Sequence, residues 1–71
     1  MAELDLRGLR CPLPALRTAK RLKSMAPGAR LTVLADDPLA AIDIPHLCRE
    51  GGHELAEHYQ DGAGWRFVIV A

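Results

Sequence analysis

The segment ELDLRGLRCPLP, residues 3–14, contains the signals of a strand, a turn and the start of a helix. Polar and apolar residues alternate over residues 3–7, which is the period of a strand with one buried face. We expect Leu4 and Leu6 to point into the core. Gly8 then supplies the turn, because glycine tolerates a positive φ. The segment therefore predicts a strand that leads directly into a helix.

Pro12 and Pro14 mark the start of this helix, because proline is tolerated in the first turn, whose amides have no partner within the helix. Cys11 is therefore predicted at the N-cap, where a side chain can accept hydrogen bonds from the first-turn amides. Pro14 has no N–H, so the amide of Leu13 is the main donor that can reach the sulfur.

The charges around Cys11 lead us to expect a reactive thiol. The positive end of a helix dipole lowers the pKa of a cysteine placed there. Arg7 and Arg10 are close in the sequence and act in the same direction. With so few amides available, the dipole and the two arginines are expected to supply most of the activation.

The first helix is predicted from Pro12 to about Ala26, where Pro27 and Gly28 end it. Its spacing of apolar residues predicts one buried stripe, and its basic residues lie on the opposite side. The stripe consists of Leu16, Ala19, Leu22 or Lys23, and Ala26. The basic face consists of Arg17, Lys20 and Arg21.

A short apolar run over residues 31–35 predicts a second, buried strand. Strand, helix and strand then form a βαβ unit, which should be parallel and right-handed. Asp37 is expected to cap a single helical turn. Asp43 is expected to cap a second start, with Pro45 in its first turn, and residues 51–52 end that helix with a left-handed glycine cap.

Two further strands are predicted over residues 53–60 and 65–70, joined by a hairpin turn at residues 61–64. The last strand is apolar on nearly both faces, so it belongs in the middle of the sheet. The predicted class is α/β, a two-layer βαβαββ sandwich with a mixed four-stranded sheet of order 1-2-4-3. Both helices cover one face, the fourth strand is antiparallel to the rest, and residues 1–71 form one domain.

The composition is that of a small ordered protein with an aliphatic core. The chain has 71 residues, of which 49% are hydrophobic and only 4% aromatic. Such a chain buries only about 60% of the surface of its unfolded form, so no large active-site cavity is expected. The net charge is zero, but residues 1–30 hold seven cations and two acids, whereas residues 31–71 hold two cations and seven acids. This charge separation can orient a partner.

We expect a cytoplasmic protein that does not enter a membrane. No run of about 18 apolar residues is present. The first residues lack the basic and apolar regions of a secretory signal. In the cytoplasm, two cysteines are more often reactive, metal-binding or buried than joined in a disulfide.

Five motifs, in order and at matching spacing, resemble the TusA/SirA family of sulfur-carrier proteins. The first contains the Cys-Pro-x-Pro element. The resemblance extends over essentially the whole chain and implies a single TusA-like domain with the βαβαββ sandwich. The motifs lie at residues 4–14, 25–28, 35–38, 43–45 and 52–55.

The resemblance implies that Cys11 accepts sulfane sulfur as a persulfide from a cysteine desulfurase and passes it to a downstream acceptor protein. Pro12 and Pro14 would fix the helix start that exposes the thiol, and Arg10 would stabilise the anionic sulfur. In the best-known role the relay ends in 2-thiouridine at the wobble position of tRNA. Relatives serve molybdenum-cofactor synthesis or sulfur oxidation. No cofactor and no autonomous turnover are implied. Several relatives carry an acidic residue in place of Leu13, which indicates a different docking surface here.

Three other functions compete with the sulfur carrier. A dithiol oxidoreductase would use Cys11 and Cys48, but the helical spacing of Cys48 from Ile44 and Leu47 places it in the core. A regulatory or nucleic-acid-binding module would use the basic helix, which lacks nearby aromatic residues for base stacking, and the sequence pI is about 6.8.

A zinc site is the third alternative. Its ligands would come from Cys11, Cys48 and the three histidines His46, His53 and His58. None of these residues has the spacing of a known zinc motif, so no metal is expected.

Overall fold

In the computed structural model, which describes residues 2–71, two helices and four strands follow one another in the order βαβαββ. This order confirms the prediction from the sequence. The elements are β1 (Ala2–Asp5), α1 (Leu13–Lys23), β2 (Arg30–Ala35), α2 (Ala40–Gly51), β3 (Glu54–Asp61) and β4 (Gly64–Val70).

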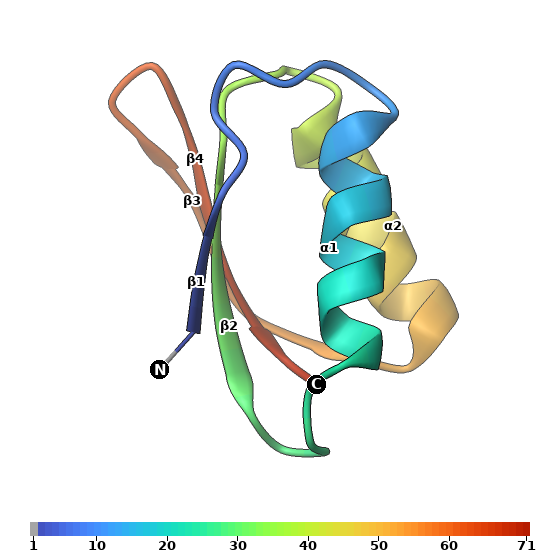
Figure 1. Ribbon diagram of the computed structural model, residues 1–71. Coiled ribbons are helices and arrows are strands. Elements are labelled where there is room, and N and C mark those ends of the chain that lie inside the picture. The colour runs from blue at the N-terminus through green and yellow to red at the C-terminus, as the bar shows by residue number, and fades with distance from the viewer. Residues whose placement is uncertain (1) are drawn as a thin grey trace.

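The four strands form one mixed sheet in the predicted order β1-β2-β4-β3. β1 and β2 are parallel, and β4 is antiparallel to both of its neighbours. Both helices lie on the same face of the sheet, as Figure 1 shows. The two-layer α/β sandwich is therefore confirmed.

The core lies between the sheet and the helices. In β2, Leu31 and Val33 are completely buried, and Phe67 and Ile69 are completely buried in β4. Successive side chains of a strand point to opposite faces, so these alternate residues share the face that the helices cover. The prediction that the last strand occupies the middle of the sheet is correct, because β4 pairs with both β2 and β3.

The buried face of α1 differs from the predicted one. Pro14, Thr18 and Leu22 are buried, whereas Leu16, which was expected in the core, is 60% exposed. A polar residue can occupy this stripe because the Thr18 hydroxyl donates a hydrogen bond of 2.7 Å to the carbonyl of Pro14. The helix also ends earlier than predicted, at Lys23.

α2 is one continuous helix, so the prediction of two separate helix starts is wrong. Pro45 lies inside it, in the second turn, where a proline removes one backbone hydrogen bond without ending the helix. Asp37 does act near the start, accepting a hydrogen bond of 3.2 Å from the amide of Leu39. Asp43 is not a cap. The left-handed cap is confirmed at Gly52, with φ of 74°.

The hairpin between β3 and β4 also follows the prediction. Gly62 has a φ of 62° in the turn. A shift of register between Leu55 and Glu57 explains why the polar and apolar residues of β3 alternate imperfectly. Gly64 begins β4 close to β2, where a Cβ atom would lie 2.4 Å from the carbonyl oxygen of Ala35. Only glycine fits this contact.

Candidate functional site

The site lies where two loops meet at one end of the sheet. One loop joins β1 to α1 and carries Cys11, and the other joins β2 to α2 and carries Asp36 and Asp37. Both appear at the top of Figure 1. They meet because β1 and β2 are parallel neighbours, so their carboxyl ends reach the same edge.

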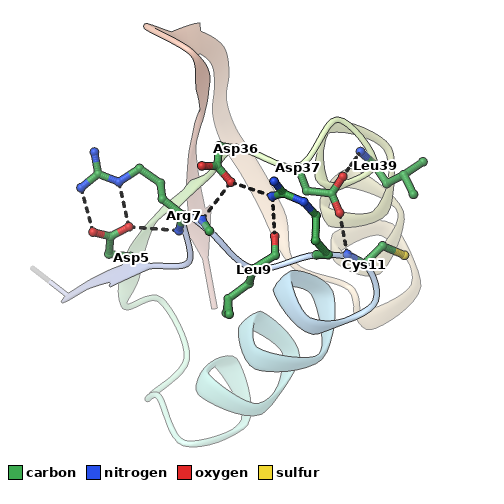
Figure 2. Close-up of polar contacts among 9 residues, drawn as sticks. Asp5, Arg7, Leu9, Cys11, Asp36, Asp37 and Leu39 are labelled. Carbon is green, nitrogen blue, oxygen red and sulfur yellow. Dashed lines mark hydrogen bonds and ion pairs between the residues drawn. The ribbon is translucent and has the colours of Figure 1, made fainter.

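Two carboxylates of the second loop hold the first loop in place (Figure 2). Asp36 accepts hydrogen bonds from the amide of Gly8 at 2.9 Å and from the Arg10 guanidinium at 3.4 Å. Asp37 accepts a hydrogen bond from the amide of Cys11. These bonds lower the pKa of Asp37, because the backbone donor of Cys11, and then that of Leu39, stabilise its charged form. Cys11 is thus fixed through its backbone.

The helix start is one residue later than predicted, and Cys11 is not the N-cap. Pro12 occupies that position, and the Cys11–Pro12 peptide bond is cis. The amide of Leu13 donates to the carbonyl of Arg10 at 2.8 Å, so it is not available to the sulfur as predicted. Pro14 is buried in the first turn and packs into the core.

The thiol of Cys11 is exposed, but its electrostatic environment is the reverse of the prediction. Its Sγ donates a hydrogen bond to Oδ2 of Asp43 in α2, at 3.2 Å. This bond raises the pKa of Cys11, and partial desolvation and the negative charges of Asp43 and Asp37 act in the same direction. A hydrogen bond from the thiol to a carboxylate stabilises the protonated form. The prediction of a lowered pKa for Cys11 is therefore wrong.

The two arginines expected to activate the thiol are bound to carboxylates instead. Arg7 forms a salt bridge of 2.8 Å with Asp5 and, chiefly through the side-chain hydrogen bond, lowers the pKa of that carboxyl to about 2. Arg10 bridges Asp36 and the carbonyl of Leu9. Within residues 2–71, no hydrogen bond or ion pair joins either guanidinium to Cys11.

The second cysteine lies in the core, as the sequence predicted. Cys48 on α2 is 2% exposed, and burial raises the pKa of its thiol. Both cysteines are free. A thiol sealed from solvent in this way cannot act as the resolving partner of Cys11 without opening the core.

The histidines do not form a centre with the cysteines. His58 stacks on Phe67, with ring centroids 4.6 Å apart. In the described part of the chain, no three histidine, cysteine, aspartate or glutamate side chains are grouped so as to hold a metal ion.

An apolar and basic groove runs along α1 beside the site. Leu13 and Leu16 are exposed in it. The basic residues of this groove are in none of the salt bridges found in residues 2–71. We call it the α1 groove, and its lining residues are Leu4, Leu13, Leu16, Arg17, Lys20, Arg21 and Ser24.

Comparison with known proteins agrees with this architecture. Residues 2–70 match the family described as Sulfurtransferase TusA. The chain belongs to this family. A solved structure, the SirA-like protein from Desulfitobacterium hafniense, is similar to the TusA-family chain with a TM-score of 0.88 at 27% sequence identity. The alignment covers 100% of this chain and 97% of that one.

Membership of the TusA family confirms the resemblance inferred from the sequence and supports a role as a sulfur carrier with protein partners in sulfur transfer. None of the helices in residues 2–71 is long and apolar enough to span a membrane.

Asp43 is the site residue that sequence reasoning missed. It stood in a motif, residues 43–45, but the proline two positions later led to its interpretation as a helix cap. The position of Asp43 within the helix is the signal that could have corrected the interpretation of this residue as a cap. Asp43 lies three residues after Ala40 and in the first helical turn. Its side chain therefore projects from the end of α2 that faces the Cys11 loop.

Proposed function

We propose that this TusA-family chain carries sulfane sulfur as a persulfide on Cys11. A cysteine desulfurase supplies the sulfur, and a downstream acceptor protein removes it. The observation that carries the proposal is that Cys11 is the exposed thiol of the chain, held by its backbone at the end of the sheet, whereas Cys48 is buried. Residues 1–71 act as one carrier domain.

The chemistry needs only a reachable sulfur atom. The thiolate of Cys11 attacks the outer sulfur of the donor persulfide, the sulfur–sulfur bond of the donor breaks, and the electron pair leaves on the donor cysteine. This displacement is the same as in thiol–disulfide exchange, and its rate depends on thiolate fraction, nucleophilicity and access. Pro12 and Pro14 contribute by fixing the start of α1 beside the thiol.

The α1 groove is the surface that we assign to partner docking. Its exposed Leu13 and Leu16 offer apolar contact. Arg17, Lys20 and Arg21 offer positive charge that none of the salt bridges within residues 2–71 uses. This combination suits an acidic segment with an apolar side chain on a partner protein. Arg10 supports the loop through its contact with Asp36.

For the destination of the sulfur we favour the synthesis of 2-thiouridine in tRNA through a protein acceptor, without binding of RNA by the carrier itself. Sulfur oxidation and molybdenum-cofactor synthesis are the alternative destinations. All three require a reduced thiol, so we place the carrier in the cytoplasm, where thiols are kept reduced.

Sulfur loading tests the proposal directly. The chain is incubated with cysteine and an active desulfurase, and its intact mass is measured under non-reducing conditions. We expect one added sulfur atom on the wild type and on Cys48→Ser, and none on Cys11→Ser. A wild type without the adduct, or a Cys48→Ser variant that fails to load, would contradict the proposal.

A further inference from the structure

The contact between the thiol of Cys11 and the carboxylate of Asp43 is the part of the site that the transfer reaction does not use. The two atoms are 3.2 Å apart, and the residues are 32 positions apart in the chain. Resting on the carrier function proposed above, we propose that Asp43 is a positioning residue that holds Cys11 as a protonated thiol in the free carrier. Sulfur transfer then requires this contact to open.

The charged groups that face the thiol support this role. Asp43 approaches from α2 and Asp37 from the loop before it, while Arg10, in the same loop as Cys11, is paired with Asp36. None of the salt bridges within residues 2–71 involves Asp43. The hydrogen bond to Asp43 is the main cause that raises the pKa of Cys11, and the negative charges of Asp43 and Asp37 act in the same direction.

Asp43 is poorly suited to the alternative role of a general base. Carboxyl groups ordinarily titrate about four pK units below thiols, so a carboxylate does not readily remove a thiol proton at neutral pH. The hydrogen bond therefore keeps the proton on sulfur. When the contact opens, the proton passes to solvent, and the thiolate becomes free to attack the donor persulfide. The leaving donor thiolate takes up a proton in turn.

The contact also depends on whether the carrier is loaded. In the persulfide form, Sγ of Cys11 is bonded to a second sulfur atom and has no proton to donate to Asp43. The hydrogen bond seen here therefore belongs to the unloaded chain. In the loaded chain, Sγ of Cys11 and the carboxylate of Asp43 are both acceptors, so no hydrogen bond can form between them. Asp43 thus favours the empty state of the thiol.

The pH profile of alkylation at Cys11 tests this role. The full chain is treated with iodoacetamide over a range of pH, and modification of the Cys11 peptide is followed by mass spectrometry. In Asp43→Asn, which keeps the size of the side chain but removes its charge, we expect the midpoint to move to lower pH. The rate at neutral pH should rise about threefold for each unit of pH by which the midpoint falls, because thiolate fraction gains more than nucleophilicity loses.

Glu50→Gln is the matched control, because it removes one carboxylate from the same helix about 10 Å along its axis. Its profile should equal that of the wild type, and an Asp43→Asn profile that also equals the wild type would overturn the proposal. If Asp43→Asn does not fold, judged by circular dichroism, Asp43→Ser gives the same test. The alkylation experiment contains no desulfurase, so it tests Asp43 separately from sulfur loading. A failure of sulfur loading would contradict the carrier function and would leave the alkylation result unchanged.

Discussion

The two cysteines of this chain have the same direction of pKa shift for different reasons. Cys48 is deprived of water by the core, whereas Cys11 is exposed and has its proton held by the carboxylate of Asp43. The direction of the pKa shift therefore does not distinguish the two thiols. Access does, because a partner sulfur can approach Cys11 from solvent and cannot approach Cys48 in the folded chain.

This difference shows how the thiol of Cys11 can be both exposed and restrained. Burial is a permanent restraint on Cys48, since removing it means opening the packing of α2 on the sheet. The restraint on Cys11 is one hydrogen bond at the surface, which a docking protein or a change of rotamer can break. The two regions thus provide an inert thiol and a releasable one in a chain of 71 residues.

The largest expected effect is the difference in alkylation rate between Cys11 and Cys48 in the folded protein. We expect iodoacetamide to modify Cys11 at least about a hundredfold faster than Cys48, because a core residue reacts only when the structure opens. Peptide mass spectrometry over time measures both rates. In denaturant the two rates should converge, and similar rates in the native protein would show that Cys48 is accessible.

Serine substitution should separate the same two positions by stability. Cys48→Ser places a hydroxyl in the apolar core and should lower the free energy of unfolding by about 1–3 kcal/mol. Cys11→Ser changes an exposed side chain and should remain within about 0.5 kcal/mol of the wild type. Equilibrium unfolding in urea, followed by circular dichroism, checks both values. Equal losses would mean that Cys11 is as well packed as Cys48.

Charge reversal in the α1 groove tests a second difference between the two cysteines, because Cys11 lies beside a basic surface and Cys48 lies in the core. The double variant Arg17→Glu and Lys20→Glu should slow sulfur loading from a desulfurase by up to about tenfold at low salt, through loss of electrostatic steering. High salt should reduce the difference. Arg49→Glu, at the far end of α2, serves as the control. An unchanged loading rate would remove the groove from the docking surface.

The smallest expected effect concerns the carboxylate that holds the backbone of Cys11. The pKa of Asp37 is lower in the folded chain than in the unfolded chain. The unfolded chain therefore binds a proton at Asp37 at a higher pH, and the ionised carboxylate stabilises the fold above its unfolded pKa. This stabilisation should be lost as the pH falls below the ordinary aspartate pKa of about 4. Thermal unfolding at several pH values should show a shallower acid dependence in Asp37→Asn than in Glu50→Gln. Identical slopes would contradict this contribution.

The topology could be predicted because its signals are local. The prolines at the start of α1, the glycines at the turns and the apolar run of β4 each fix a neighbouring element, and few arrangements connect them. The buried face of α1 could not be predicted by the same means. Thr18 is polar by composition, and only its bond to the carbonyl of Pro14 makes it a core residue, which left Leu16 as the more plausible choice.

For the site, the sequence separated the exposed Cys11 from the buried Cys48 but predicted the wrong surroundings for Cys11. The position of Cys11 follows from local signals and from the resemblance. Its surroundings depend on Asp43, which is 32 residues away in sequence, and on the pairing of Arg10 with Asp36. Proximity in the sequence suggested two activating cations, but folding brought carboxylates to both the arginines and the thiol.

The burial of Cys48 has a consequence for stoichiometry. Because the thiol of Cys48 is buried in the core, the folded chain has one accessible thiol. Under the proposed function, each molecule therefore accepts a single sulfur atom. The concentration of modified chain then equals the amount of sulfur in transit. A mass spectrum of the intact protein would thus measure the fraction of carrier that holds sulfur, with no correction for a second site.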